Sequence, residues 1–241
     1  DKFKKHVLKR KKHGIILNVN PIGETLIGEF EAKERINKYI EILNNENVNY
    51  LSIKLSTIHS QIDAIAHEEL IEECIPRLSK LYNEVIKIKE STGVEKFINL
   101  DMEEYQDLSI TLQTFMRTLN KSEFKTIKAG IVLQAYLPDT FEEAVKLRDW
   151  AKERVKNGGA PVKVRIVKGA NLEMEKTEAS IHGWPLATYS NKLDTDANYK
   201  KILLELLLPS SAESLNIGVA SHNIFDLAFC LNLTLKNNLQ K

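Results

Sequence analysis

The sequence predicts an α/β protein of the TIM-type (β/α)8 barrel class, with only about six of the eight βα units present in the chain. Short runs rich in Ile, Val and Leu alternate with longer segments of helical periodicity, which is typical of parallel strands joined by helices. The turn after the first run reads NVNPIGE instead of GxGxxG, which disfavours an open dinucleotide-binding sheet. The sequence has 241 residues, 43% of them hydrophobic, enough to bury one substantial core. We therefore expect a basic segment over 1–14 and a partial barrel domain over 15–241.

Each predicted strand is a short apolar run, and each is followed by a predicted helix. The six strands are expected at 15–20, 50–56, 97–102, 130–136, 162–168 and 216–221.

Two of the predicted helices carry recognisable ends. The helix after the second strand has apolar residues at three- and four-residue steps from Ile62 to Ile88, and Ser60 with Asp63 predicts its capped start. The helix after the fourth strand is expected to start at Asp139. It should end in the segment 157–159, Asn-Gly-Gly, where a left-handed residue is favoured.

Composition and charge exclude several classes of protein. Lys plus Arg (34) nearly balances Asp plus Glu (33), so nucleic-acid binding is not expected. Cys74 and Cys230 lack CxxC spacing, which disfavours a zinc cluster and a disulfide-stapled secreted fold and indicates a reducing compartment. No apolar run approaches the roughly 20 residues that span a bilayer. Seven Lys and Arg residues among the first twelve suggest a solvated helix, and contact with anionic lipid or another domain is the alternative.

Polar side chains occur at the carboxyl end of five predicted strands, where the active site of a barrel collects. Burial of charged and amide groups inside apolar strands costs several kcal/mol unless they pair with each other or with a ligand. The candidates are Lys54, Asp101, Gln134, Arg165, Lys168, Ser221, His222 and Asn223.

Each candidate also has a simpler interpretation. Lys54 is compatible with a rim lysine, Asp101 with a helix cap and His222 with a polar turn, while Arg165 and Lys168 could form salt bridges with Asp101. Their joint occurrence favours a ligand. No nucleophile elbow and no HxH, HExxH or CxxC pattern is present, so neither hydrolysis nor a metal is expected. Convergent cations and amides suit an anionic cofactor.

A set of segments in this order resembles the barrel of the flavin-dependent proline dehydrogenases, and in particular the proline dehydrogenase domain of bacterial proline utilization A. The segments are NVNPIGE (18–24), SIKLS (52–56), FINLDMEEY (97–105), GIVLQAYLPD (130–139), GGAPVKVRIVKGAN (158–171), HGWP (182–185), TDANY (195–199) and GVASHN (218–223). The resemblance covers about 15–230.

The resemblance implies an FAD-dependent oxidation of L-proline to Δ1-pyrroline-5-carboxylate, with hydride transfer to the flavin N5 and electrons passed to a quinone. It also implies a pyrroline-5-carboxylate (glutamate semialdehyde) dehydrogenase domain in the parent protein. The expected location is cytoplasmic, with peripheral contact at the inner face of the bacterial membrane as an alternative.

The resemblance further implies a role for each candidate residue. Lys54 would face the proline carboxylate, Asp101 would orient the cationic groups of that pocket, and Arg165 would hydrogen-bond the flavin near N5. The implied cofactor-binding residues are Gln134, Arg165, Val167, Lys168, Gly169, Ala170, Ser190, Lys192, Thr195, Ser221, His222 and Asn223.

Two departures from the family pattern matter. Asn171 stands where some members have Tyr, and the paired arginines of a YxxRRE-like motif, which grip the substrate carboxylate, are not found. We therefore expect the chain, as a C-terminally truncated domain, to oxidise proline weakly or not at all by itself. The alternatives are a Schiff-base aldolase that uses Lys168 or Lys54, and a non-catalytic barrel fragment.

Overall fold

The computed structural model describes residues 2–23, 26, 28–62 and 64–239. The chain forms two compact units, each described by itself below. Unit 1 comprises 1–101 and 113–129, and unit 2 comprises 102–112 and 130–241. The helix α4 (Asp107–Leu119) contributes residues to both units.

Unit 1 is built on three parallel strands, in which β2 pairs with β1 on one side and with β3 on the other. The strands are β1 (Asn18–Val19), β2 (Tyr50–Lys54) and β3 (Phe97–Asp101). The helices are α1 (Lys2–Lys11), α2 (Glu29–Asn44) and α3 (His67–Thr92), and short 3₁₀ turns lie at η1 (Leu55–Thr57), η2 (Ala64–Ala66) and η3 (Ser122–Phe124).

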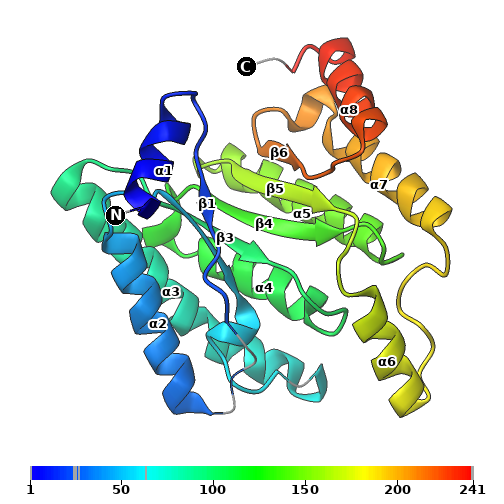
Figure 1. The fold of residues 1–241 in the computed structure, drawn as a ribbon, viewed down its shortest axis with the longest axis horizontal. Coiled ribbons are helices and arrows are strands. Elements are labelled where there is room, and N and C mark those ends of the chain that lie inside the picture. The colour runs from blue at the N-terminus through cyan, green and yellow to red at the C-terminus, as the bar shows by residue number, and fades with distance from the viewer. Residues whose placement is uncertain (1, 24–25, 27, 63, 240–241) are drawn as a thin grey trace. The chain divides into compact units, whose positions relative to one another are not determined.

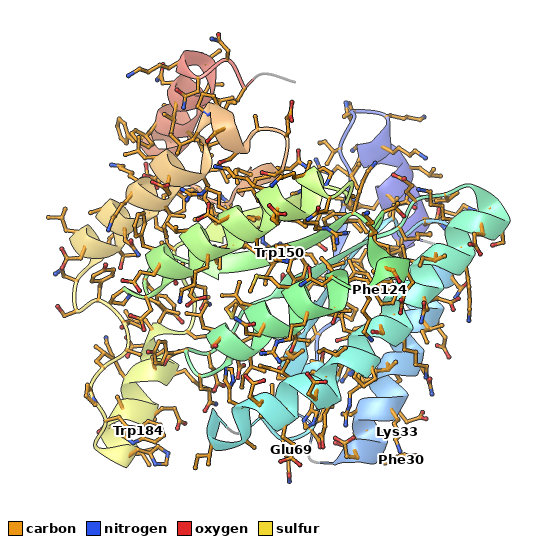
Figure 2. The ribbon with its side chains drawn as sticks, turned by 180° about the vertical axis from the view of Figure 1, so that it is seen from behind. Phe30, Lys33, Glu69, Phe124, Trp150 and Trp184 are labelled. Carbon is orange, nitrogen blue, oxygen red and sulfur yellow. The ribbon has the colours of Figure 1, made fainter. Side chains whose placement is uncertain are left out.

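The core of unit 1 lies between its strands and the helices α2 and α3. Helix α2 buries Ala32, Ile36, Tyr39 and Leu43, which are spaced by three or four residues and therefore share one face. In β2 the apolar residues Leu51 and Ile53 are fully buried. Figure 1 shows the strands of this unit, and Figure 2, turned by 180°, brings α3 to the front.

Unit 2 is also built on three parallel strands, with β5 between β4 and β6. The strands are β4 (Ala129–Gln134), β5 (Val162–Val167) and β6 (Leu215–Val219). The helices are α5 (Thr140–Lys156), α6 (Leu172–His182), α7 (Lys192–Leu206) and α8 (Ile224–Lys236), and the short 3₁₀ turn η4 is Pro209–Ser211. Helix α7 packs against both α5 and α8.

The six predicted strands are confirmed, and their boundaries differ from the prediction by a few residues. The order of one helix after each strand holds except after β5, which is followed by both α6 and α7. The reason is a break at Gly183, which has a φ of +66° and ends α6.

The predicted caps were only partly right. Helix α3 starts at His67, so Ser60 does not cap it, and the Ser60 hydroxyl instead donates to Glu29 Oε1 at 2.7 Å. Asp63 lies outside the described residues. Asp139 occupies the N-cap position of α5, but its carboxylate makes no capping bond and accepts from the Tyr105 hydroxyl at 2.7 Å. At the other end, Gly158 has a φ of +80°, as expected.

The basic N-terminal segment forms α1, none of whose side chains is buried. Its helical, solvated character therefore agrees with the first interpretation of this segment. Among the described residues, no helix is long and apolar enough to cross a bilayer. Cys74 and Cys230 are both buried, and neither forms a disulfide within the described residues.

Candidate functional site

In unit 1, the polar side chains of β2 and β3 lie on one face. The strands pair with Ser52 opposite Asn99 and Lys54 opposite Asp101, and partners in a parallel ladder point to the same side. The apolar residues between them are buried on the other side. Lys54 and Asp101 are therefore neighbours at the carboxyl ends of two adjacent strands.

The Asp101 carboxylate is the centre of a hydrogen-bond network on this face. Oδ1 accepts from Asn99 Nδ2 at 2.7 Å and from the Ser52 hydroxyl at 3.1 Å, and Oδ2 accepts from Asn20 Nδ2 at 3.4 Å. Asn18 Nδ2 donates in turn to Ser52 Oγ at 2.9 Å. Helix α4 begins six residues beyond Asp101, so the helix-cap interpretation of Asp101 is not supported.

Ser52 and Asn99 were not among the candidates from the sequence. The sequence contained a signal for both. Ser52 precedes Lys54 by two residues and Asn99 precedes Asp101 by two residues, so each pair lies on one face of an otherwise apolar strand. A polar residue in such a position is expected to pair with its neighbour across the strands.

In unit 2, Gln134 and Arg165 lie on one face of the three strands. Gln134 is opposite Val167, Arg165 is opposite Gly218, and residues two apart in a strand share a side. The burial of β5 alternates accordingly, with Val164 buried and Arg165 half-buried. A Cβ on Gly218 would lie 3.3 Å from Lys163 Cε and 3.6 Å from Arg165 Cβ, so the glycine leaves slightly more room for the Lys163 side chain.

Gln134 is 2% exposed and is held by its amide nitrogen. Nε2 donates to the main-chain oxygens of Met102 at 3.3 Å and Glu103 at 3.2 Å. Its Oε1 is buried and has no hydrogen-bond partner within the described part of the chain. A buried acceptor of this kind suits a ligand that carries an N–H group.

Lys163 is a further cation on the Arg165 face that the sequence reasoning missed. Burial, followed by the nearby Arg165 charge, lowers the pKa of Lys163. The i, i+2 spacing of Lys163 and Arg165 was the signal. Two cations on one strand face are suited to contact an anionic ligand.

Lys168 lies just beyond the end of β5 and is held by two carboxylates. Its ammonium is 2.5 Å from Asp196 Oδ1 on α7 and 2.7 Å from Asp226 Oδ2 on α8. Burial acts to lower the pKa of Lys168, but the bonds to Asp196 and Asp226 outweigh it, so the pKa is raised. Lys192 binds the other oxygen of Asp196, and the Ser221 hydroxyl donates to Asp226 at 3.1 Å.

The structure thus brings Lys168, Lys192 and Ser221 into one cluster through two aspartates that the candidate list lacked. Asp196 belongs to the TDANY segment, and Asp226 lies in the first turn of α8. Two lysines and two aspartates cancel in charge, so this cluster is not a simple cationic patch. The sequence suggested a salt bridge between Lys168 and Asp101. Because Asp196 and Asp226 already pair with Lys168, that salt bridge is not needed to balance the lysine charge.

The segment after β5 includes the predicted cofactor residues Val167, Gly169 and Ala170. Gly169 has a φ of +129°, a conformation that other residues rarely adopt. A Cβ on Gly169 would lie 2.4 Å from Cγ of the Tyr136 ring. Packing against Tyr136 is therefore a sufficient reason for glycine here, whether or not a cofactor approaches. Val167 is half-buried, and Ala170 is exposed.

The remaining candidates lie near helix starts. Ser190 and Lys192 are exposed at the start of α7, and Thr195 in its first turn donates to Asn191 O at 3.4 Å. His222 is exposed, and Asn223 caps α8 by accepting from Phe225 N at 2.9 Å. The helix start of α7 presents N–H groups and a lysine, which suits a phosphate.

These features fit a flavin nucleotide in kind. The unsatisfied acceptor of Gln134, the two cations on β5 and the start of α7 offer partners for a ring with N–H groups and for a pyrophosphate. The neutralised state of Lys168 is a less direct fit, because its charge is already matched by Asp196 and Asp226.

Comparison with known proteins places the chain. The family model described as proline dehydrogenase matches residues 3–241. A proline dehydrogenase of Deinococcus radiodurans is 28% identical over 219 residues, which is 89% of this chain and 60% of that protein. The proline dehydrogenase 1 of Bacillus subtilis is 26% identical over 239 residues, and the match covers 98% of this chain and 66% of the Bacillus protein.

Solved structures agree with these matches. Proline utilization A from Corynebacterium freiburgense is 40% identical with a TM-score of 0.92, over 98% of this chain and 24% of that chain. The protein from Bdellovibrio bacteriovorus is 32% identical with a TM-score of 0.86, over 98% of this chain and 26% of that chain. The predicted fold class, an α/β barrel of which about six βα units are present, is confirmed. The chain belongs to the proline dehydrogenase family.

Proposed function

We propose that this chain provides the flavin-binding face and part of the substrate pocket for an FAD-dependent oxidation of L-proline to Δ1-pyrroline-5-carboxylate. The observation that carries the proposal is that Gln134 and Arg165 lie on the same face of β4, β5 and β6. The membership of the chain in the proline dehydrogenase family supports it. FAD, when bound, would supply a hydride acceptor at its N5.

The residues of unit 2 would bind and orient the cofactor. Arg165, with Lys163 on the same face, would donate to the ring near N5 and favour negative charge there. Gln134 would offer its buried Oε1 to the ring edge. Ser190, Lys192 and Thr195 at the start of α7 would hold the pyrophosphate and adenosine part. Val167, Gly169, Ala170 and the segment 221–223 would line the flavin.

The residues of unit 1 would act on proline. Lys54 would bind the substrate carboxylate, and Asp101, itself fixed by Ser52, Asn99 and Asn20, would keep the cationic groups of that pocket oriented. Oxidation of the ring removes a hydride from the carbon next to nitrogen and a proton from the nitrogen.

The Schiff-base aldolase alternative is disfavoured at Lys168. An amine that attacks a carbonyl needs a depressed pKa, whereas the two carboxylates raise the pKa of Lys168. Borohydride trapping with a keto substrate is the direct check, and we expect no adduct.

The wider role is part of the same proposal. Electrons would pass to a quinone, and the product to a pyrroline-5-carboxylate dehydrogenase domain of the parent protein. The second point is supported by the likeness to the bifunctional protein PutA of Klebsiella aerogenes, which is 28% identical over 78% of this chain. We place the protein in the cytoplasm, with the exposed basic α1 available for contact with an anionic membrane face.

The test begins with cofactor binding. The purified chain is mixed with FAD, and quenching of flavin fluorescence is followed by flavin content after gel filtration. We expect Arg165→Met to weaken binding about tenfold or more. The matched control is Arg117→Met, which removes a surface arginine of α4 that pairs with Glu68. A folded chain that does not bind FAD, or an equal loss in both variants, contradicts the proposal.

Turnover is tested separately, with L-proline and a dye as electron acceptor. Because no YxxRRE-like pair occurs in the sequence, which spans 60% of the Deinococcus relative, we propose that this chain turns over proline weakly by itself. Robust turnover by this chain would refute that part of the proposal and leave the cofactor part intact.

A further inference from the structure

Unit 2 contains a cavity of about 500 Å³ that no predicted cofactor or substrate residue lines. Its walls come from the loop before α4, the loop before α5, helix α6 and the segment after α6. The charged and aromatic lining residues are Glu104, Tyr105, Asp139, Glu175, Glu178 and Trp184. The volume is in the range of small-molecule sites.

The cavity carries four carboxylates, and none of the described residues that line it is basic. Neutral groups bind three of these carboxylates. The Tyr105 hydroxyl donates to Asp139 at 2.7 Å, the Tyr105 main-chain N–H donates to Glu175 at 2.7 Å, and Gln106 Nε2 donates to Glu104 at 2.7 Å. Such donors satisfy oxygens without cancelling charge. Among the described residues, Glu178 alone of the four has a salt-bridge neighbour that can become cationic, His182 at 3.3 Å.

Glu175 is the residue that indicates a ligand. It is only 9% exposed, it projects from α6 into the lining of the cavity, and one carboxylate oxygen accepts from Tyr105. The second oxygen has no hydrogen-bond partner in the described part of the chain. The side chain as a whole is about nine-tenths buried, but this oxygen keeps some contact with solvent through the cavity. A ligand with an N–H group could therefore reach it and supply the donor that the protein does not.

The electrostatics of neighbouring groups agree with an uncompensated negative potential. Burial, and then the charges of Glu104 and Glu178, raise the pKa of Glu175 against the opposing bond from Tyr105. Burial, followed by Glu104, Glu103 and Glu175, raises the pKa of Asp107 to about 7. In both cases burial is the larger cause, and the neighbouring carboxylates add to it.

The remaining wall is apolar and aromatic. Trp184 is 59% exposed at the end of α6, where Figure 2 labels it, and its ring stacks on His182 with centroids 4.3 Å apart. The other apolar lining residues are Pro138, Ala179, Pro185, Leu186 and Ala187. Aromatic faces attract cations, so Trp184 and Tyr105 suit the same kind of guest as the carboxylates.

We propose that this cavity binds a small organic cation with N–H donors on an apolar or aromatic body, such as an amidinium, guanidinium or primary ammonium compound. Glu175 binds the cationic head with its unpaired oxygen, Glu178 and Asp139 add charge, and Trp184 contacts the body. A quaternary ammonium, which has no N–H group, satisfies the Glu175 oxygen less well.

Benzamidine is the probe, and its neutral isostere benzamide is the control ligand. Both are titrated into the full chain by calorimetry, without FAD or proline, so the result does not depend on the proposed redox function. We expect benzamidine to bind with a dissociation constant of about 1 mM or lower and benzamide to bind at least about tenfold more weakly. Binding should quench the fluorescence of Trp184.

Two variants and one matched control locate the site. Glu175→Gln should weaken benzamidine binding about tenfold or more, and Glu178→Gln, at an exposed position that tolerates change, about threefold. Glu173→Gln on the same helix, which is paired with Lys176 and does not line the cavity, should change nothing. The proposal is overturned if benzamidine does not bind, if benzamide binds equally, or if Glu173→Gln weakens binding as much as the two lining variants.

Discussion

Lys168 and Asp226 form an ion pair of 2.7 Å in which the carboxylate is almost completely buried, with its side chain 3% exposed. The same ammonium binds Asp196, so one lysine from the end of β5 joins α7 and α8. This contact connects a residue predicted to bind a cofactor with the packing of two helices. Stability and cofactor binding must therefore be measured separately for every variant in this cluster.

We expect Lys168→Met to lower the free energy of unfolding by about 3 kcal/mol, because it leaves Asp226 buried without a cation. The double variant Lys168→Met with Asp226→Asn should recover most of this loss, since the neutral amide can still accept from Ser221. Lys192→Met, at a side chain that is 73% exposed, should cost less than about 1 kcal/mol. Urea unfolding of the four proteins checks this. A double variant no more stable than Lys168→Met would contradict the ion-pair explanation.

Gly169→Ala is expected to destabilise the fold by about 3 kcal/mol, because the left-handed backbone is strained and the new Cβ overlaps the Tyr136 ring. Gly28→Ala is the control, since its φ is −149° and a Cβ there meets no atom within 4 Å. Thermal unfolding followed by circular dichroism measures both. If the two variants melt alike, packing against Tyr136 does not explain the glycine.

The raised pKa of Asp107 should make the stability of the chain depend on pH. Its pKa in the folded chain is about 7, above the ordinary value of 3.8, so folding favours the protonated form. The stabilisation is fully present below about pH 4 and is lost as the pH rises through about 7. The rise of the pKa from 3.8 to about 7 sets an upper limit of about 4 kcal/mol, and we expect Asp107→Asn to be about 2 kcal/mol more stable than the parent at pH 8.5.

Denaturant unfolding at pH 4 and pH 8.5 checks this prediction. The variant and the parent should have nearly the same stability at pH 4. An advantage of the variant that is equal at both pH values would show that the effect is not the titration of Asp107.

Glu29 should contribute to stability with the opposite pH dependence, because its pKa is lowered on folding. The hydrogen bond from Arg77 is the main cause that lowers the pKa of Glu29 from 4.5 to about 2, and both guanidinium nitrogens contact the carboxylate. The contribution is present above about pH 4.5 and is lost as the pH falls towards 2. Arg77→Lys should cost about 1 kcal/mol at pH 7, because lysine cannot make the paired contact and the site is partly exposed.

The comparison variant is Arg117→Lys, which removes the same kind of paired contact from Glu68 at a more exposed position, so we expect a smaller loss of unfolding free energy, below about 0.5 kcal/mol. The cost of Arg77→Lys should shrink at pH 2.5. A cost that stays constant between pH 7 and pH 2.5 would assign the effect to the Arg77 bond with Ile58 O.

Much of the fold was predictable because burial follows local periodicity. The apolar run at 162–168 predicted β5, and the observed alternation of burial places Arg165 on the face opposite Val164. The glycines at 158–159 predicted the end of α5. Helix starts were less predictable, because the side chain of Ser60 found a better partner in Glu29 than in the backbone ahead of it.

The site was predictable in its residue types and less so in its contacts. The strand-end positions of Lys54, Asp101, Gln134 and Arg165 follow from the pattern of the strands. Asn99 and Lys163 were missed, although their two-residue spacing from Asp101 and Arg165 carried the signal. Roles towards proline, flavin and quinone stay predictions that the proposed binding and turnover experiments test.

The sequence by itself determined the order of strands and helices, the polar residues at the strand ends and the family. The tertiary structure decided that Lys168 is neutralised by Asp196 and Asp226, that Tyr136 fills the space over Gly169, and that Glu175 faces a cavity with an unpaired oxygen. The physical reason is the sequence distance over which each kind of information acts. Periodicity records whether a residue is buried, but the partner of a buried charge or ring comes from a distant segment that only packing brings near.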